Sequence, residues 1–155
     1  MAEKQYVVFK LIDGEYGIEI MQVKEIIKYQ RTVKIPDAPD FIEGVINYRD
    51  STTPVIDLAK RFNVGEKEKT DSSRIIVTNI NSRHIGFVVD SVEEVLKISK
   101  ESIDTVPEIM GGIDKQYING VGKLGERLVI LLNVNEVLSS TEKSRLEAID
   151  NNQHV

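Results

Sequence analysis

The chain has 155 residues, with 20 Lys and Arg against 25 Asp and Glu, so its formal net charge is −5. Hydrophobic residues make up 41% and charged residues 29%, which is typical of one soluble globular domain, and the acidic balance disfavours nucleic acid and anionic membranes as partners. The absence of Cys and the presence of only two histidines, His84 and His154, exclude disulfides, thiol nucleophiles and metal sites built from several Cys or His side chains.

The apolar residues are mainly β-branched, since 20 Ile and 18 Val stand against 9 Leu. Branching at Cβ restricts χ1 and suits the pleated surface of a sheet better than a helix. The composition therefore predicts a mostly β fold whose core is built by Ile and Val.

Strand-like runs dominate the first half of the chain, and Asp13-Gly14 between the first two predicts a type I′ hairpin turn. The interval from Val23 to Tyr29 is ambiguous, because its apolar spacing fits a helix and equally fits a strand after one helical turn. Pro36 and Pro39 then indicate a loop or one short helical turn. The predicted strands are 6–12, 15–18, 42–48 and 54–58, and a short helix is expected at 58–62.

A polar, charge-mixed stretch from Gly65 to Ser73 predicts a solvated loop near the middle of the chain. Beyond it the strand pattern returns, with turns expected at 81–83 and 125–126. Ser139 and Glu142 form a capping box, which predicts a helix near the C-terminal end. The strands predicted in this half are 74–80, 85–89, 92–98, 117–124 and 127–132.

About ten short strands in two groups, separated by the polar loop near 65–73, indicate two small β-barrels packed as one unit. No clear sequence repeat relates the two groups. We expect this two-barrel domain over residues 1–140, followed by a C-terminal helix and polar tail over 141–155. A groove between the barrels and the exposed strand edges are the expected docking places for a partner.

One segment, Gly120 to Gly125, matches the G-x-G-x-x-G pattern of dinucleotide-binding loops. Such a loop must open a helix whose N-terminus holds the pyrophosphate, and an acidic residue should follow about 20 positions later. Here a β-type run follows the glycines, and Arg145 stands near the acidic position. We therefore interpret the glycines as strand and hairpin residues.

The other candidate catalytic and metal-binding residues do not form a recognisable site either. His84 lies in a predicted turn, which favours an exposed histidine over a Ser-His-acid site. Asp37 and Asp40 lack the apolar surroundings of catalytic carboxylates, and the acidic residues at 90, 93 and 94 lack the spacing of a calcium loop. The sequence predicts no active site, no metal and no cofactor, so recognition of another protein is the remaining class of function.

Residues 41–58, FIEGVINYRDSTTPVIDL, resemble the signature of the CheW family of bacterial chemotaxis coupling proteins, which reads roughly F-I-x-G-V-x-N-L-R-G-x-I-x-P-V-I-D-L. Three further stretches are similar to the family and follow in family order, at 15–26, 85–92 and 117–133. Together the similar segments extend from about Tyr6 to Leu138.

This resemblance implies two five-stranded, SH3-like barrels and a protein without catalytic activity. It also implies the partners, which are the CheW-like regulatory domain of the histidine kinase CheA and the cytoplasmic tips of methyl-accepting chemotaxis receptors. Adaptors of this family join the two in signalling arrays. The polar N-terminus and the lack of a long apolar run agree with a cytoplasmic protein, held at the inner face of the membrane through such arrays.

Carried over residue by residue, the family's receptor-docking surface maps onto Val23, Glu25, Asn47, Arg49, Gly86 and Val92. The two valines would supply apolar contact, and Arg49 a fork of donors for a carboxylate or for helix-end carbonyls. Gly86 would allow close backbone approach. Two alternatives stay open, namely Val92 as a core residue and Arg49 as a solvated turn residue.

The chain departs from the family pattern inside this surface. The family's N-L-R-G stands here as Asn47-Tyr48-Arg49-Asp50. Asp50 can adopt a positive φ, although less readily than Gly, so a hairpin remains compatible with the sequence. Tyr48 adds a hydroxyl that must reach water or a partner, and Thr53 replaces an aliphatic residue.

Other functions remain as alternatives. The same resemblance fits an isolated CheW-like regulatory domain of a larger signalling protein, although the start at Met1 and the polar tail at 151–155 favour a stand-alone chain. A small-ligand or hydrolytic β-barrel enzyme is a third hypothesis, and it has no catalytic constellation in its favour.

Overall fold

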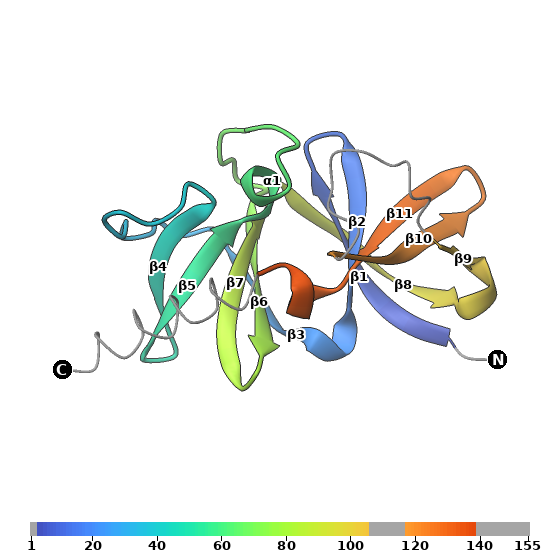
Figure 1. Ribbon diagram of the computed structural model, residues 1–155, viewed down its shortest axis with the longest axis horizontal. Coiled ribbons are helices and arrows are strands. Elements are labelled where there is room, and N and C mark those ends of the chain that lie inside the picture. The colour runs from blue at the N-terminus through green and yellow to red at the C-terminus, as the bar shows by residue number, and fades with distance from the viewer. Residues whose placement is uncertain (1–2, 106–116, 139–155) are drawn as a thin grey trace.

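Strands make up most of the structure, as the excess of Ile and Val predicts (Figure 1). A computed structural model describes residues 3–105 and 117–138. The strands are β1 (Glu3–Leu11), β2 (Gly14–Glu19), β3 (Val23–Lys28), β4 (Ile42–Tyr48), β5 (Ser51–Asp57), β6 (Arg74–Ile80), β7 (Arg83–Val89), β8 (Ser91–Ser99), β9 (Ile103–Asp104), β10 (Ile118–Leu124) and β11 (Arg127–Leu132).

Helical segments are short. They are α1 (Leu58–Arg61) and the 3₁₀ turns η1 (Ile20–Gln22), η2 (Lys100–Ser102) and η4 (Val134–Glu136). The ambiguous interval after Ile20 is one 3₁₀ turn followed by strand β3, which confirms the second of the two alternatives. Helix α1 begins where predicted, because the Asp57 carboxylate caps it by accepting from the Lys60 amide. The helix predicted around Ser139 and the tail over 141–155 lie outside the described residues.

The strands form two sheets with the same pattern of pairing. A five-stranded sheet, the first barrel, has the order β3-β6-β7-β5-β4, and a six-stranded sheet, the second barrel, has the order β8-β1-β2-β11-β10-β9. In each, an outer strand pairs with a hairpin, and the hairpin's second strand pairs in parallel with the next strand, β7 with β5 and β2 with β11. The two predicted barrels are thus confirmed, with the two-residue β9 as a sixth strand of the second.

The boundary between the barrels is not where the sequence predicted it. Hairpin β1–β2, at the start of the chain, belongs to the second barrel, and hairpin β6–β7, beyond the polar loop, belongs to the first. Grouping strands by their position along the chain was therefore wrong. The reason is that β8 and β11 obtain their hydrogen-bond partners from the N-terminal hairpin, which no local pattern indicates.

Among the described residues, three clusters of buried side chains form the core. Each barrel encloses one of them: Ile46, Tyr48, Val55, Ile75, Val77 and Val88 in the first, and Tyr6, Val8, Ile98, Val129 and Leu131 in the second. The largest, which we call the inter-barrel cluster, lies between the sheets and consists of Val7, Phe9, Leu11, Tyr16, Ile18, Ile56, Leu58, Phe62, Ile76, Ile80, Ile85, Phe87, Val89, Tyr117, Ile118, Leu132, Val134, Val137 and Leu138. Central strands are therefore apolar on both faces.

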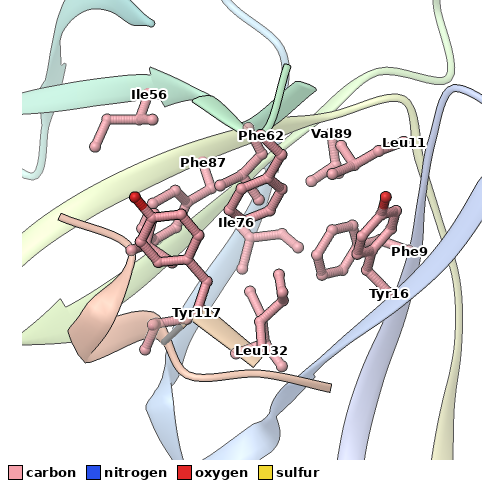
Figure 2. Packing of buried hydrophobic residues seen from close by; sticks show 14 of the residues in the cluster. Phe9, Leu11, Tyr16, Ile56, Phe62, Ile76, Phe87, Val89, Tyr117 and Leu132 are labelled. Carbon is pink, nitrogen blue, oxygen red and sulfur yellow. The ribbon is translucent and has the colours of Figure 1, made fainter. Parts of the chain in front are cut away.

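Aromatic rings pack against one another within the inter-barrel cluster (Figure 2). Phe9 stacks on Tyr16 with ring centroids 6.0 Å apart, and Tyr16 stacks on Phe62 at 6.2 Å. Phe62 in turn contacts Tyr117 at 5.7 Å. The interior of the contact between the barrels is thus filled by packed side chains, and the docking groove expected there stays a prediction for the rim of this cluster.

The first hairpin turn is displaced by one residue from its predicted place. Leu11 pairs with Gly14, so the central turn residues are Ile12 and Asp13, and Ile12 takes a φ of +56°. A left-handed Ile is unfavourable by about 1–2 kcal/mol. The Ile12 amide donates to the Asp90 carboxylate at 2.6 Å, a tertiary hydrogen bond that stabilises this turn.

The glycine run beginning at Gly120 lies in strand β10 and its turn, so the interpretation as strand and hairpin residues is confirmed. A Cβ on Gly120 would come within 2.6 Å of the Ile103 side chain and 2.9 Å of the Asp104 carbonyl oxygen. Glycine is therefore required here by the close approach of β9.

Candidate docking site

The β4–β5 turn presents the centre of the predicted docking surface. Tyr48 ends β4 and Ser51, its partner, begins β5, so Arg49 and Asp50 are the two turn residues. Their φ values are +50° and +64°, which is the geometry of a two-residue hairpin turn whose twist matches the strands. The replacement of Gly by Asp50 is thus accommodated.

Strand alternation decides which side chains around this turn face outward. Tyr48 is 5% exposed and lies in the first-barrel cluster, whereas Asn47 beside it is exposed. The Arg49 side chain is 63% exposed. Asn47 and Arg49 are therefore available to a partner, and the Tyr48 ring is not.

Glu25 on β3 joins this turn to the neighbouring edge of the first barrel. Its Oε1 accepts a hydrogen bond from the Tyr48 hydroxyl at 2.6 Å and another from Arg49 Nη2 at 3.0 Å. These two hydrogen bonds, the Tyr48 one first, hold the pKa of the Glu25 carboxyl below its usual range. Burial and then the bond to Glu25 raise the pKa of Tyr48 above its ordinary value.

His84 packs against the same group from a third strand. Its ring meets the Tyr48 ring edge-on, with centroids 5.4 Å apart, and it is half-buried in β7. The expectation of an exposed turn histidine was therefore wrong, because Asn81 and Ser82 form the turn. In Figure 1 the β4–β5 and β6–β7 turns lie at one end of the first barrel, near the beginning of β3.

The predicted valines lie on the rim of the inter-barrel cluster. Val23 begins β3, and Val92 lies in β8 opposite Phe9; both are partly buried against that cluster. Val23 is two residues from Glu25 and pairs with Thr78 of β6. The two ends of β7 lead to different parts of the molecule. His84 lies near its N-terminal end, and Val92 follows three residues after its C-terminal end. The structure therefore places Val23 on the same strand as Glu25, the partner of Arg49, and Val92 on a strand of the other barrel, at the rim of the same cluster.

Gly86 is buried in the middle of β7 rather than displayed on the surface. It pairs with Val77 on one side and with Val55 on the other. A Cβ at this position would lie 2.7 Å from Ile75 Cγ2 and 3.4 Å from Val55 Cγ2. Its side-chain space is thus already occupied within the first barrel, which indicates a packing role.

Two residues near this surface were not singled out as candidates. Tyr48 was noted only as a departure that must find a hydroxyl partner, and the structure provides Glu25. Met21 in η1 is 84% exposed and precedes Val23 by two residues. A single apolar residue in a short turn gives no periodic signal, so the sequence could not identify it.

Within residues 3–105 and 117–138, no group of three or more His, Cys, Asp or Glu is placed to hold a metal ion. No helix in this part of the chain is long and apolar enough to cross a membrane.

Comparisons of the sequence and of the structure with known proteins agree on one family. The sequence model described as CheW-like domain matches residues 5–142. The chain is 36% identical over 146 residues to chemotaxis protein CheW of Klebsiella aerogenes, covering 94% of this chain and 88% of that protein, and 34% identical over 146 residues to chemotaxis protein CheW of Treponema pallidum, covering 92% and 86%. The crystal structure of scaffolding protein TtCheW from Thermoanaerobacter tengcongensis superposes with a TM-score of 0.84 at 37% identity, covering 92% of each chain.

Proposed function

The chain belongs to the CheW family of chemotaxis scaffold proteins, and on that premise we propose that it couples methyl-accepting chemotaxis receptors to the histidine kinase CheA. It acts by binding, without catalysis, and works in the cytoplasm at the inner face of the membrane, where receptor tips and kinase meet. The fold supports binding over nucleotide chemistry, because the segment 120–125, which matches the dinucleotide-loop pattern, lies in strand β10 and its turn.

The observation that carries this proposal is the placement of Arg49. Its backbone is held in a two-residue turn, its guanidinium is exposed, and Glu25 pairs with it at 3.0 Å. A planar fork of N–H donors on a rigid turn suits a carboxylate or the carbonyls at a helix end. Asn47 beside it adds a polar contact, and Val23 adds an apolar one on the adjacent strand. We retain Gly86 and Val92 as proposed members of the docking surface.

Co-sedimentation tests the function directly. The purified chain is mixed with receptor cytoplasmic fragments, with CheA, and with both, and we expect it to pellet with the receptor fragments and to recruit the kinase. Binding to neither partner would contradict the proposal.

Replacement of Arg49 tests the docking surface. Arg49→Ala should weaken receptor binding by about 10- to 150-fold, since hydrogen bonds to charged groups are worth about 1.5–3 kcal/mol. The melting temperature should stay nearly unchanged, because an exposed ion pair contributes little to stability. Isothermal titration and thermal unfolding give the two readouts.

Arg127→Ala is the matched control. Arg127 also pairs with carboxylates, Glu15 at 2.8 Å and Glu94 at 3.0 Å, but it belongs to the second barrel. It should leave receptor binding unchanged. A large loss of thermal stability in Arg49→Ala, or equal receptor binding in both variants, would show that Arg49 is not a docking residue.

A further inference from the structure

The carboxylate of Glu25 is held by two donors, one buried and one exposed. Tyr48 and Arg49 both donate to Oε1, the hydroxyl at 2.6 Å and the guanidinium at 3.0 Å. The Tyr48 ring is 5% exposed, packed in the first-barrel cluster and braced edge-on by His84 at 5.4 Å. The Arg49 side chain is 63% exposed at the tip of a turn. One donor is therefore fixed by the core, and the other is exposed to solvent and to a partner.

This asymmetry matters when Arg49 engages a partner. If Arg49 leaves Glu25 for an acidic group of the partner, Glu25 loses its counter-charge beside an incoming negative charge. A hydrogen bond from a second, immobile donor keeps the carboxylate satisfied and holds it in place. The family signature has Leu where this chain has Tyr48, and Leu offers no such donor.

We propose that the Tyr48 hydroxyl is a positioning group for receptor docking: it holds the Glu25 carboxylate so that Arg49 can exchange Glu25 for an acidic group of the receptor. This inference rests on the proposed receptor-coupling function. It assigns Tyr48 a role through Glu25 and Arg49, and not through direct contact, because the ring is buried.

The surroundings of Glu25 are consistent with this role. The charged or titratable groups that act on it are Tyr48 from β4, Arg49 from the turn and Lys24 from β3, while His84 of β7 contacts the Tyr48 ring. The hydrogen bond from Tyr48 is the largest single cause that lowers the pKa of the Glu25 carboxyl, and Arg49 lowers it as well, by its hydrogen bond and by its charge. The titration of Glu25 therefore reports on the Tyr48 hydroxyl separately from partner binding.

Tyr48→Phe tests the proposal, because it removes the hydroxyl and keeps the ring. Tyr29→Phe is a matched control, since Tyr29 also packs on the first-barrel cluster and also donates to a glutamate, Glu43, at 2.9 Å. The full chain is titrated by NMR with carbon-labelled Glu side chains, and its affinity for receptor cytoplasmic fragments is measured for the wild type and both variants.

Tyr48→Phe should raise the pKa of Glu25 toward its ordinary value and weaken receptor binding by about three- to tenfold, the effect of one intramolecular hydrogen bond. Arg49→Ala should leave the pKa of Glu25 below the ordinary value, because Tyr48 still donates. Tyr29→Phe should change neither the Glu25 titration nor the affinity. Should Tyr48→Phe not fold, Tyr48→Leu restores the family residue, and the same two readouts apply to it.

The inference is overturned if Glu25 titrates as in the wild type without the Tyr48 hydroxyl, or if Tyr48→Phe and Tyr29→Phe bind receptor equally. Failure of the proposed function looks different. In that case the wild type itself does not bind receptor fragments, while the Glu25 titration still decides whether Tyr48 positions the carboxylate.

Discussion

Tyr29 shows how one half-buried hydroxyl can make the stability of this fold depend on pH. It donates to Glu43 Oε1 at 2.9 Å, and the Lys69 ammonium lies 5.8 Å from its ring centroid. Lys69 also contacts Glu43 at 3.7 Å and Asp57 at 3.3 Å. Burial first, and then the hydrogen bond to Glu43, raise the pKa of Tyr29 to about 12.

A raised tyrosine pKa stabilises the folded state only while the phenol keeps its proton. The stabilisation is complete below the ordinary pKa of 10.0 and should be lost as the pH rises from there to about 12. Tyr29→Phe should lower the free energy of unfolding near neutral pH by about 0.5–1.5 kcal/mol and reduce this alkaline loss. Urea unfolding across the alkaline range measures both. A Tyr29 that titrates at its ordinary pKa in a phenolate absorbance titration would contradict the expectation.

At the scale of strands, each barrel contains one parallel pair, and each pair contains a buried glycine. Gly86 of β7 lies beside Val55 of β5, and Gly17 of β2 lies beside Leu131 of β11. An added Cβ would meet Ile75 Cγ2 at 2.7 Å in the first case and Leu131 Cδ2 at 3.0 Å in the second. The Ile methyl sits on a stiff branched carbon, whereas the Leu methyl ends a flexible side chain.

Gly86→Ala should therefore destabilise the protein by about 1–3 kcal/mol through overpacking, and Gly17→Ala should have a smaller effect. Chemical denaturation of both variants gives the comparison. If Gly86→Ala is as stable as the wild type, the packing role is excluded and direct contact with a receptor becomes the better explanation of this position. Receptor binding should be measured well below the melting temperature of the variant, so that unfolding does not mimic lost contact.

At the scale of the whole molecule, the chain weaves the two barrels together. It begins in the second barrel with β1–β2, builds the first barrel from β3 to β7, and returns to complete the second. The inter-barrel cluster draws residues from both sheets, so neither sheet has a solvated outer face over this area (Figure 2). The barrels should therefore unfold together.

Cutting the chain in the polar loop tests this expectation. Fragments 1–67 and 68–155 each lack a hairpin that one of the barrels needs, because β1–β2 pairs with β8 and β11 while β6–β7 pairs with β3 and β5. Neither fragment alone should unfold cooperatively, whereas the intact chain and the co-expressed fragments should each give one transition. Circular dichroism with thermal unfolding provides the measurement. A cooperative transition in either isolated fragment would show that the barrels fold independently.

The sequence predicted most strands because their signals are local. The bounds of β4, β6 and β11 agree with the predicted ranges 42–48, 74–80 and 127–132, where β-branched runs end at polar turns. The first turn was displaced because the hydrogen bond between Ile12 and Asp90 joins residues 78 apart in the chain. Of the candidate site, the family motif identified Glu25 and Arg49, and the structure pairs them. The family motif could not show that Gly86 is buried while other residues of the predicted surface are exposed.

By itself, then, the sequence determined the class of fold, the family and the bounds of strands such as β4, β6 and β11, because propensity and motif depend on neighbours along the chain. Only the tertiary structure decided which hairpin completes which barrel and that the space between the barrels is filled. It also decided that the hydroxyl of Tyr48 reaches Glu25 at 2.6 Å. Each of these depends on side chains that are distant in sequence but share one packed interior. There, the space open to one side chain and its hydrogen-bond partners depend on all its neighbours.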